Sequence, residues 1–183
     1  MSYRTILVSA CAALAAAAPL AGQSTEIGVS SGLSVFTAEG ADALTVFSTP
    51  GSGSLLPTSS FYVTAFPSPN VSIEPQIGLL VAASGGATDW MGSFGAQIAY
   101  HSRGGADSSP YFGGNASWVR DLAEDNNFTL GAVVGYRWIV PPGLGLRVEA
   151  GYKRWFTGGE DGFDPPDLNQ FGLTIGIGGL VGG

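Results

Sequence analysis

The chain has 183 residues, enough for one domain, and its formal net charge of −7 argues against nucleic acid as a partner. Only 11% of the residues are charged, well below the usual ~25%, and the 29 glycines are about twice the usual ~7%. Beyond residue 22 no apolar run approaches the ~20 residues of a membrane-spanning helix, so a membrane protein of this sequence would have to be a β-barrel.

Residues 1–22 predict a cleaved secretory signal peptide. Arg4 precedes an alanine-rich apolar run (6–20) that ends in small residues. The single cysteine, Cys11, would leave with this segment, so the mature chain would hold no disulfide. An exported all-β chain without disulfides suits a bacterial envelope. We therefore expect residues 23–183 to form the folded domain.

Alternation of apolar with small or polar residues predicts strands along the first half of this domain. The first strand is expected over 26–36. The segment 37–59 is rich in Gly, Ser, Thr and Pro and predicts a long connection, although 43–48 could extend a hairpin. A second strand is expected over 61–66, where Pro67 ends the pattern.

The third strand, from residue 71 to 81, has the clearest separation of two faces. Pro75 lies in its middle, and because proline has no N–H to donate to the ladder, we expect a bulge or irregularity there. A fourth strand follows over 90–101 and a fifth over 111–118. The connection between them, 103–109, is polar and predicts a turn.

Residues 127–156 predict an antiparallel hairpin of strands six and seven. Pro141, Pro142 and Gly143 separate two alternating runs and cannot continue a ladder. One face of each run is apolar and aromatic, and the other carries glycines and full charges. Strand eight is expected over 170–181.

Eight strands of about ten residues predict an all-β fold, an eight-stranded antiparallel up-and-down transmembrane β-barrel. Short turns would lie at one end of the barrel, and the two longest connections, 37–59 and 157–168, would share the other. Short periplasmic turns and long outer loops are typical of this architecture.

The whole pattern resembles the small outer-membrane β-barrel proteins of diderm bacteria, the class that includes the OmpA transmembrane domain and OmpX. Its last strand is similar to the assembly signal of such proteins at Gln170, Gly172, Ile175 and Ile177. It departs from that signal because its final hydrophobic residues are aliphatic and glycines follow them. The resemblance implies the outer membrane as location, with membrane lipid and the barrel-assembly machinery as partners.

The polar face of four strands predicts a charged lumen. Its expected members are Glu74, Gln76, Gln97, Arg137, Arg147, Glu149 and Lys153. An eight-stranded barrel is just wide enough for side chains to fill it, so a packed ionic core without a pore is the favoured interpretation. A narrow ion path through the same cluster is the alternative.

Aromatic residues near the strand ends of the apolar face predict anchoring at the two membrane interfaces. The expected girdle consists of Trp90, Tyr100, Trp118, Phe128, Trp138, Tyr152 and Phe171. In a soluble sandwich the same residues would form the core.

No enzyme, cofactor or metal site is expected. Some barrels resembling this one modify lipid A with a histidine-containing catalytic set near the outer leaflet, but the single histidine, His101, falls at the opposite end of the predicted topology. The acidic segment 160–167 matches no calcium loop. We expect a structural or surface-interaction role with loops 37–59 and 157–168 as contact sites. A small channel is the first alternative, and an exported soluble β-sandwich or lipocalin-like binder the second.

Overall fold

The structure is a computed structural model, and it describes residues 25–38, 43–48, 60–84, 87–104, 107–120, 126–141, 143–157 and 168–181. The predicted signal peptide and most of the two longest connections lie outside these residues. None of the described residues forms a helix long and apolar enough to cross a membrane.

The described chain consists of antiparallel strands. They are β1 (Thr25–Thr37), β2 (Leu44–Ser48), β3 (Ser60–Ser68), β4 (Val71–Ser84), β5 (Ala87–His101), β6 (Ser109–Arg120), β7 (Asn126–Val140), β8 (Leu144–Thr157) and β9 (Leu168–Val181). Each of them except β2 follows its predicted run and is longer by one or more residues at one or both ends. Backbone hydrogen bonding between neighbouring strands continues beyond the residues whose alternation of apolar and polar side chains predicted the strand.

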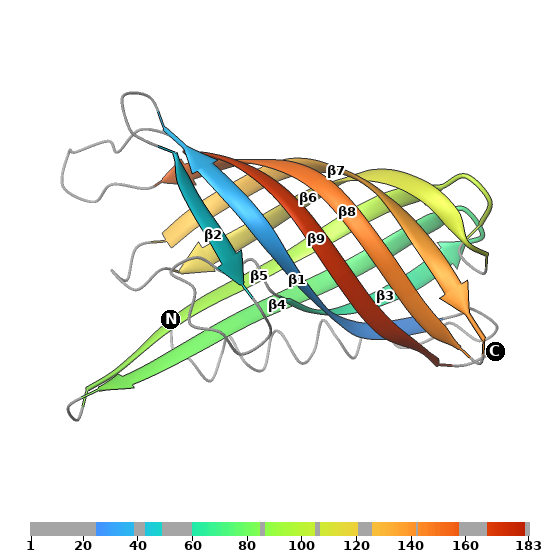
Figure 1. Cartoon of the computed structure of the whole chain (residues 1–183), viewed down its shortest axis with the longest axis horizontal. Coiled ribbons are helices and arrows are strands. Elements are labelled where there is room, and N and C mark those ends of the chain that lie inside the picture. The colour runs from blue at the N-terminus through green and yellow to red at the C-terminus, as the bar shows by residue number, and fades with distance from the viewer. Residues whose placement is uncertain are drawn as a thin grey trace.

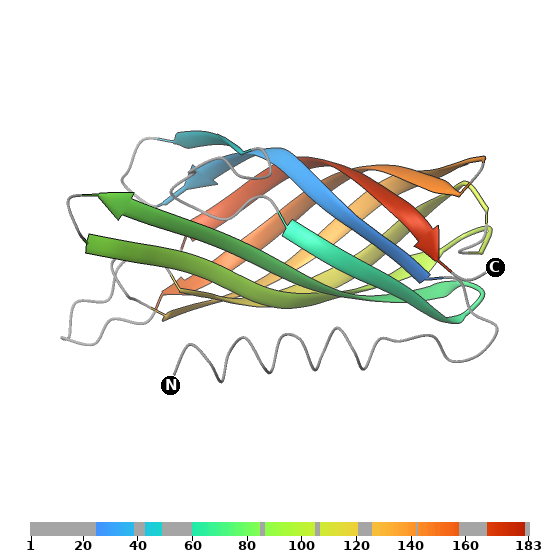
Figure 2. The same cartoon turned by 90° about the horizontal axis from the view of Figure 1, so that it is seen from below.

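Eight of these strands close into a barrel (Figures 1 and 2). From β3 to β9 each strand pairs with its neighbours in sequence, and β1 joins β3 to β9. The closing ladder runs the full length of β1, from Thr25 opposite Val181 to Thr37 opposite Asn169. The predicted up-and-down barrel is therefore confirmed.

Strand β2 pairs with β1 but is not one of the eight strands that close the barrel. One edge of β1 pairs with β9, and the other edge is shared between two partners. Residues 25–30 of β1 pair with β3, and residues 32–36 pair with β2. The segment 43–48, which the sequence allowed as part of a hairpin, thus covers the stretch of β1 that the shorter β3 leaves open.

The two ends of the barrel differ. The end that holds the β3–β4, β5–β6 and β7–β8 connections is called here the turn end, and the opposite end the loop end. At the turn end Gly143 adopts a φ of 102°, which only glycine adopts readily. At the loop end the β4–β5 hairpin continues past Gly92, where the pairing of β5 with β6 stops (Figure 1).

The expected irregularity at Pro75 is present on one side only: the β3–β4 ladder passes from Gln76 to Ile73 with no pair at Pro75. Pro75 pairs in regular register with Ala96 of β5. A register shift lies further along the same β3–β4 ladder, between Ala65 and Ser68, so it brackets Pro67. β3 continues through Pro67, which the sequence pattern placed at its end. The shift falls at the turn end, where the two strands of the hairpin are about to separate and a missing N–H disturbs few neighbours.

The barrel is polar inside and apolar outside. Large hydrophobic side chains face outward with exposed fractions up to 63% at Ile175 and 62% at Phe112. Charged and polar side chains, by contrast, are among the most buried, such as Glu26 at 1% and Glu74 at 2%. A soluble β-sandwich or lipocalin-like barrel would have the opposite arrangement, so that alternative does not describe this fold.

Candidate functional site: the barrel lumen

An ion pair from strands at opposite ends of the sequence closes the lumen at the turn end. The Arg137 guanidinium lies with Nη2 2.6 Å and Nε 2.7 Å from Oε2 of Glu26. The Tyr62 hydroxyl donates to the other carboxylate oxygen of Glu26 at 2.7 Å. β1, β3 and β7 thus meet across the barrel through three buried side chains.

A second ionic group lies beside the first. The Arg147 guanidinium donates to Oε2 of Glu74, which also accepts from the Thr64 hydroxyl, while Gln76 Nε2 donates to Oε1 of Glu74 at 2.7 Å. Arg147 Nε also lies 3.8 Å from Oε2 of Glu149. Arg147 thus faces two carboxylates, and its close pairing with Glu74 compensates one buried charge of each sign.

Aromatic rings pack against both guanidinium groups. Arg147 lies over the Tyr62 ring, with its Cζ 3.7 Å from the ring centroid, and Arg137 lies 5.1 Å over Phe66. His101 stacks on Tyr111 with ring centroids 5.0 Å apart. Together these contacts fill the spaces between the ion pairs.

The ionic plug is defined here as Glu26, Tyr62, Thr64, Phe66, Ser72, Glu74, His101, Tyr111, Arg137 and Arg147. The cavity left within this part of the lumen measures about 10 Å³, and a single water needs about 10–15 Å³ of such space. Inward-facing glycines make this density possible. A Cβ at Gly135 would lie 2.6 Å from the Tyr111 ring, and one at Gly176 would lie 2.6 Å from Nε of Arg147.

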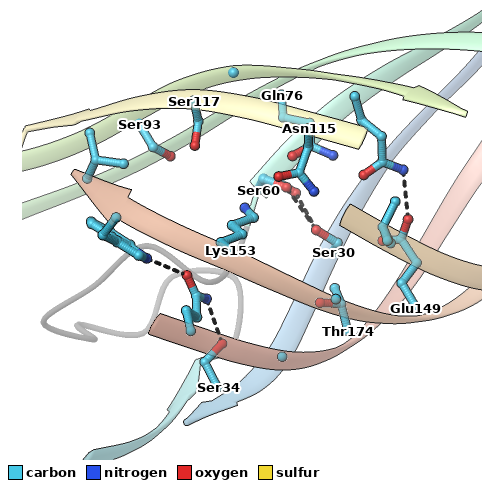
Figure 3. A pocket seen from close by; sticks show the side chains of 18 residues that line it. Ser30, Ser34, Ser60, Gln76, Ser93, Asn115, Ser117, Glu149, Lys153 and Thr174 are labelled. Atoms are coloured by element: carbon cyan, nitrogen blue, oxygen red, sulfur yellow. Dashed lines mark hydrogen bonds between the residues drawn. The ribbon is translucent and has the colours of Figure 1, made fainter. Parts of the chain in front are cut away.

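Toward the loop end the lumen opens into a cavity of about 90 Å³ (Figure 3). Short polar side chains form most of its wall: Ser30, Ser34, Ser60, Ser93, Ser117, Thr174, Gln76, Gln97 and Asn115. The Ser30 and Ser60 hydroxyls are hydrogen-bonded to each other at 2.8 Å. This space is called here the polar cavity.

Lys153 extends into the polar cavity from β8 (Figure 3). Among the residues that the structure describes, its ammonium group has neither a hydrogen bond nor an ion pair within 4.0 Å. Glu149, four residues earlier on the same strand, is engaged elsewhere, because its Oε1 accepts from Gln97 Nε2 at 2.9 Å and its Oε2 faces Arg147.

An apolar cluster lies inside the barrel at its loop end. Phe36, Val119 and Trp155 are each at most 3% exposed, and Leu168 packs against them. The Phe36 and Trp155 rings meet edge to face, 5.9 Å apart. Trp155 Nε1 donates to Gln170, which in turn donates to the Ser34 hydroxyl, both at 2.9 Å. The polar cavity thus lies between an ionic plug and an apolar cluster.

The structure places all seven residues of the predicted lumen set inside the barrel, but in two different environments. Glu74, Arg137 and Arg147 belong to the ionic plug, whereas Lys153 lines the polar cavity and the remaining three, Gln76, Gln97 and Glu149, border it. The sequence analysis omitted Glu26 and Tyr62, which are central to the plug. The alternation of β1 contained the signal for Glu26, because it shares a face with Gly28 and Ser30.

The predicted girdle residues lie on the outer surface wherever their side chains are described. Tyr100 and Trp138 are near the turn end, with Phe112 and Tyr136 as their ring partners. Phe128, Tyr152 and Phe171 are near the loop end, where Tyr152 and Phe171 pack 5.2 Å apart. Trp118 is half-buried opposite Phe128. The side chain of Trp90 lies outside the described part.

The predicted assembly-signal residues occupy β9. Gln170 points inward and is 7% exposed, and Gly172 borders the polar cavity. Ile175 and Ile177 point outward, 63% and 46% exposed. The strand that carries them is the one that closes the barrel against β1.

No family model matches the chain, and no curated protein does. Solved structures resemble its fold. The neisserial surface protein A has a TM-score of 0.51 and 14% identity, over 84% of this chain and 96% of that one. Ail, the attachment invasion locus protein of Yersinia pestis, has a TM-score of 0.48 and 10% identity, over 87% and 99%. The outer membrane protein OprG of Pseudomonas aeruginosa has 0.45 and 12%, over 89% and 97%.

Proposed function

We propose that this chain is an integral outer-membrane β-barrel protein with a non-conducting lumen and a structural or surface-interaction role. The observation that carries the proposal is the ionic plug, which fills the barrel at the turn end with paired charges and stacked rings. A membrane location and a closed lumen are separate parts of the proposal and rest on different evidence.

The outer surface supports insertion into a bilayer. Strands of 12 to 15 residues, such as β6 and β7, exceed the ~9–11 residues that a tilted strand needs to cross. Ile98, Val134 and Ile175 expose more than half of their side chains between the two groups of aromatic rings. Amphipathic rings favour the interfaces, so their separation along the barrel suits the two faces of a membrane.

The interior supports a closed lumen. A permeating ion would have to pass Arg147, whose guanidinium binds Glu74 on one side and lies over Tyr62 on the other. The small cavity of about 10 Å³ in this part of the lumen supports a barrel without a hydrated path. Opening one would require breaking a buried ion pair, which costs about 3–5 kcal/mol when one partner is removed.

The loop end supports a contact role. In the usual orientation the turn end would face the periplasm and the loop end the cell exterior. Connections 37–59 and 157–168, the proposed contact sites, leave the barrel at that end, and they lie largely outside the described residues. Outer-membrane lipid and the barrel-assembly machinery are the partners that this role requires.

We also propose that the protein is not an enzyme and uses no cofactor. His101 lies at the turn end, where Nε2 is hydrogen-bonded to Ser72 at 2.9 Å and the ring is enclosed by Phe66 and Tyr111. Such a histidine fills space and closes the barrel rather than facing a substrate.

Expression of the full chain in a diderm bacterium tests the location. We expect the protein in the outer-membrane fraction, with a mobility on gels that changes when the sample is heated. Recovery as a soluble periplasmic protein without that change would contradict membrane insertion.

Planar-bilayer recording of the same purified, folded protein tests the lumen. We expect no discrete current steps above the bilayer baseline. Steps that persist in the wild type, and that change in size when Arg147 is replaced by Glu, would establish the channel alternative instead.

A further inference from the structure

The ammonium group of Lys153 is the feature of the lumen that the ionic plug does not account for. The plug pairs each of its cations with a carboxylate, whereas Lys153 has no carboxylate within 4.0 Å in the described chain, and Glu149, which also lines the polar cavity, lies beyond that distance. A charge removed from bulk water without a partner is costly. The polar cavity around this group is therefore suited to a negatively charged occupant.

Proton donors accompany the charge. The Ser30 and Ser60 hydroxyls are hydrogen-bonded to each other, and the Ser30 hydroxyl also lies 3.4 Å from the Ser60 carbonyl oxygen, so an anion would compete with that carbonyl for its proton. Ser117 and Thr129 share one hydrogen bond between two hydroxyl groups, which leaves one hydroxyl proton for a further acceptor. Asn115 has a buried amide with an unpartnered Oδ1, and because the two orientations of an amide fill the same space, it can present its NH₂ group instead.

The dimensions of the polar cavity limit the occupant to a small one. Its volume of about 90 Å³ holds a single ion with a few waters, but neither a sugar nor a lipid. Part of the wall is glycine: a Cβ at Gly151 or Gly172 would meet its nearest neighbour only at 3.4 Å, ordinary contact. A larger side chain would therefore fit at these two positions, and the glycines leave that space empty.

We propose that the polar cavity binds a small monovalent anion, a halide or a carboxylate of one or two carbons, with the Lys153 ammonium as its charge partner. The serine hydroxyls and the Asn115 amide complete its shell. The proposal concerns the folded barrel alone and holds whether or not the lumen conducts.

Bromide is the probe. The folded wild-type protein in detergent is heated in increasing bromide, with gluconate, an anion too large for the cavity, keeping the ionic strength constant, and the unfolding midpoint is read from the gel shift. We expect a saturable rise in the midpoint. Binding only to the folded state raises stability in this way. An equal midpoint in bromide and gluconate at every concentration would overturn the proposal.

Lys153→Met removes the charge and keeps the side chain's length. We expect the apparent dissociation constant for bromide to rise about tenfold or more, because a hydrogen bond to a charged group is lost. Lys153→Arg is the matched control and should retain saturable binding. An unchanged bromide response in Lys153→Met would refute the assignment.

Crystals of the wild-type protein soaked in bromide give a measurement that depends on no variant. An anomalous peak in contact with Lys153 Nζ supports the site. A cavity that contains only water under these conditions overturns it. Heat-dependent gel mobility of the same sample reports the folded barrel, so failure of the anion site is distinguished from failure of the barrel.

Discussion

The turn-end and loop-end halves of the lumen are built from the same alternation of glycine with polar residues, yet one is full and the other hollow. In the ionic plug the long side chains of Arg137 and Arg147 reach carboxylates of other strands, and Arg147 lies against Gly176 of the neighbouring strand β9. Around the polar cavity the inward residues include five serines and three glycines, which are too short to reach across. Side-chain length, rather than polarity, therefore decides where an eight-stranded barrel is closed.

The two halves also differ in how they compensate charge. The ionic plug neutralises its cations with carboxylates of other strands, whereas the polar cavity leaves Lys153 to interact with whatever enters. Substitutions of equal size should consequently have unequal effects in the two halves. The predictions below use this contrast, beginning with the largest expected effect.

Arg147→Met should destabilise the barrel strongly. It leaves Glu74 and Glu149 without their shared cation, and an uncompensated buried charge costs about 3–5 kcal/mol. Lys153→Met, the matched change in the polar cavity, should leave the stability unchanged or raise it slightly, because no ion pair is broken and a charge without a close partner is removed. Urea unfolding of the barrel refolded in lipid measures both. Equal unfolding midpoints for the two variants would contradict the contrast.

Gly28→Ala should cost about 1–3 kcal/mol, the usual penalty for overpacking. Its Cβ would overlap the Tyr62 ring and the Ile177 carbonyl oxygen. Gly151→Ala adds the same methyl group beside the polar cavity, where its nearest neighbour is 3.4 Å away, and we expect almost no change. The free energy of unfolding of each variant is compared with the wild type, and a larger loss for Gly151→Ala would reverse the interpretation.

Tyr62→Phe removes one hydroxyl from the ionic plug. Since that hydroxyl donates to the Glu26 carboxylate, we expect a loss of about 1.5–3 kcal/mol, typical of hydrogen bonds to charged groups. Ser60→Ala removes a hydroxyl that faces the polar cavity and should cost about 0.5–1.5 kcal/mol, typical of a neutral pair. We compare the unfolding midpoints of the two variants and expect the lower one for Tyr62→Phe. A lower midpoint for Ser60→Ala would contradict the prediction.

Ser93→Val should have the smallest effect on stability, within about 0.5 kcal/mol, because no hydrogen bond of the Ser93 hydroxyl is recorded in the described chain. The added methyl groups should nevertheless reduce the space for bromide. We expect a weakened bromide response at an unchanged unfolding midpoint in gluconate. A bromide response equal to that of the wild type would mean that Ser93 does not line the anion site.

Much of the architecture follows from the sequence. The alternation in 127–156 placed Arg147 and Lys153 on one face and Tyr152 on the other, as the structure has them. The strand order and closure followed as well. The position of the β3–β4 irregularity could not be predicted from Pro75 alone, because a proline disturbs a ladder only on the side to which its N–H would point, and that depends on register.

The sequence by itself determined which side chains point inward, because a period of two leaves no choice once a strand forms. Only the tertiary structure decided which of them meet. Arg137 binds Glu26 across 111 residues of chain, and Arg147 binds Glu74 across 73. These partners are set by the stagger of the strands on closure, which brings distant residues to one level of the barrel and leaves Lys153 without a described carboxylate within 4.0 Å.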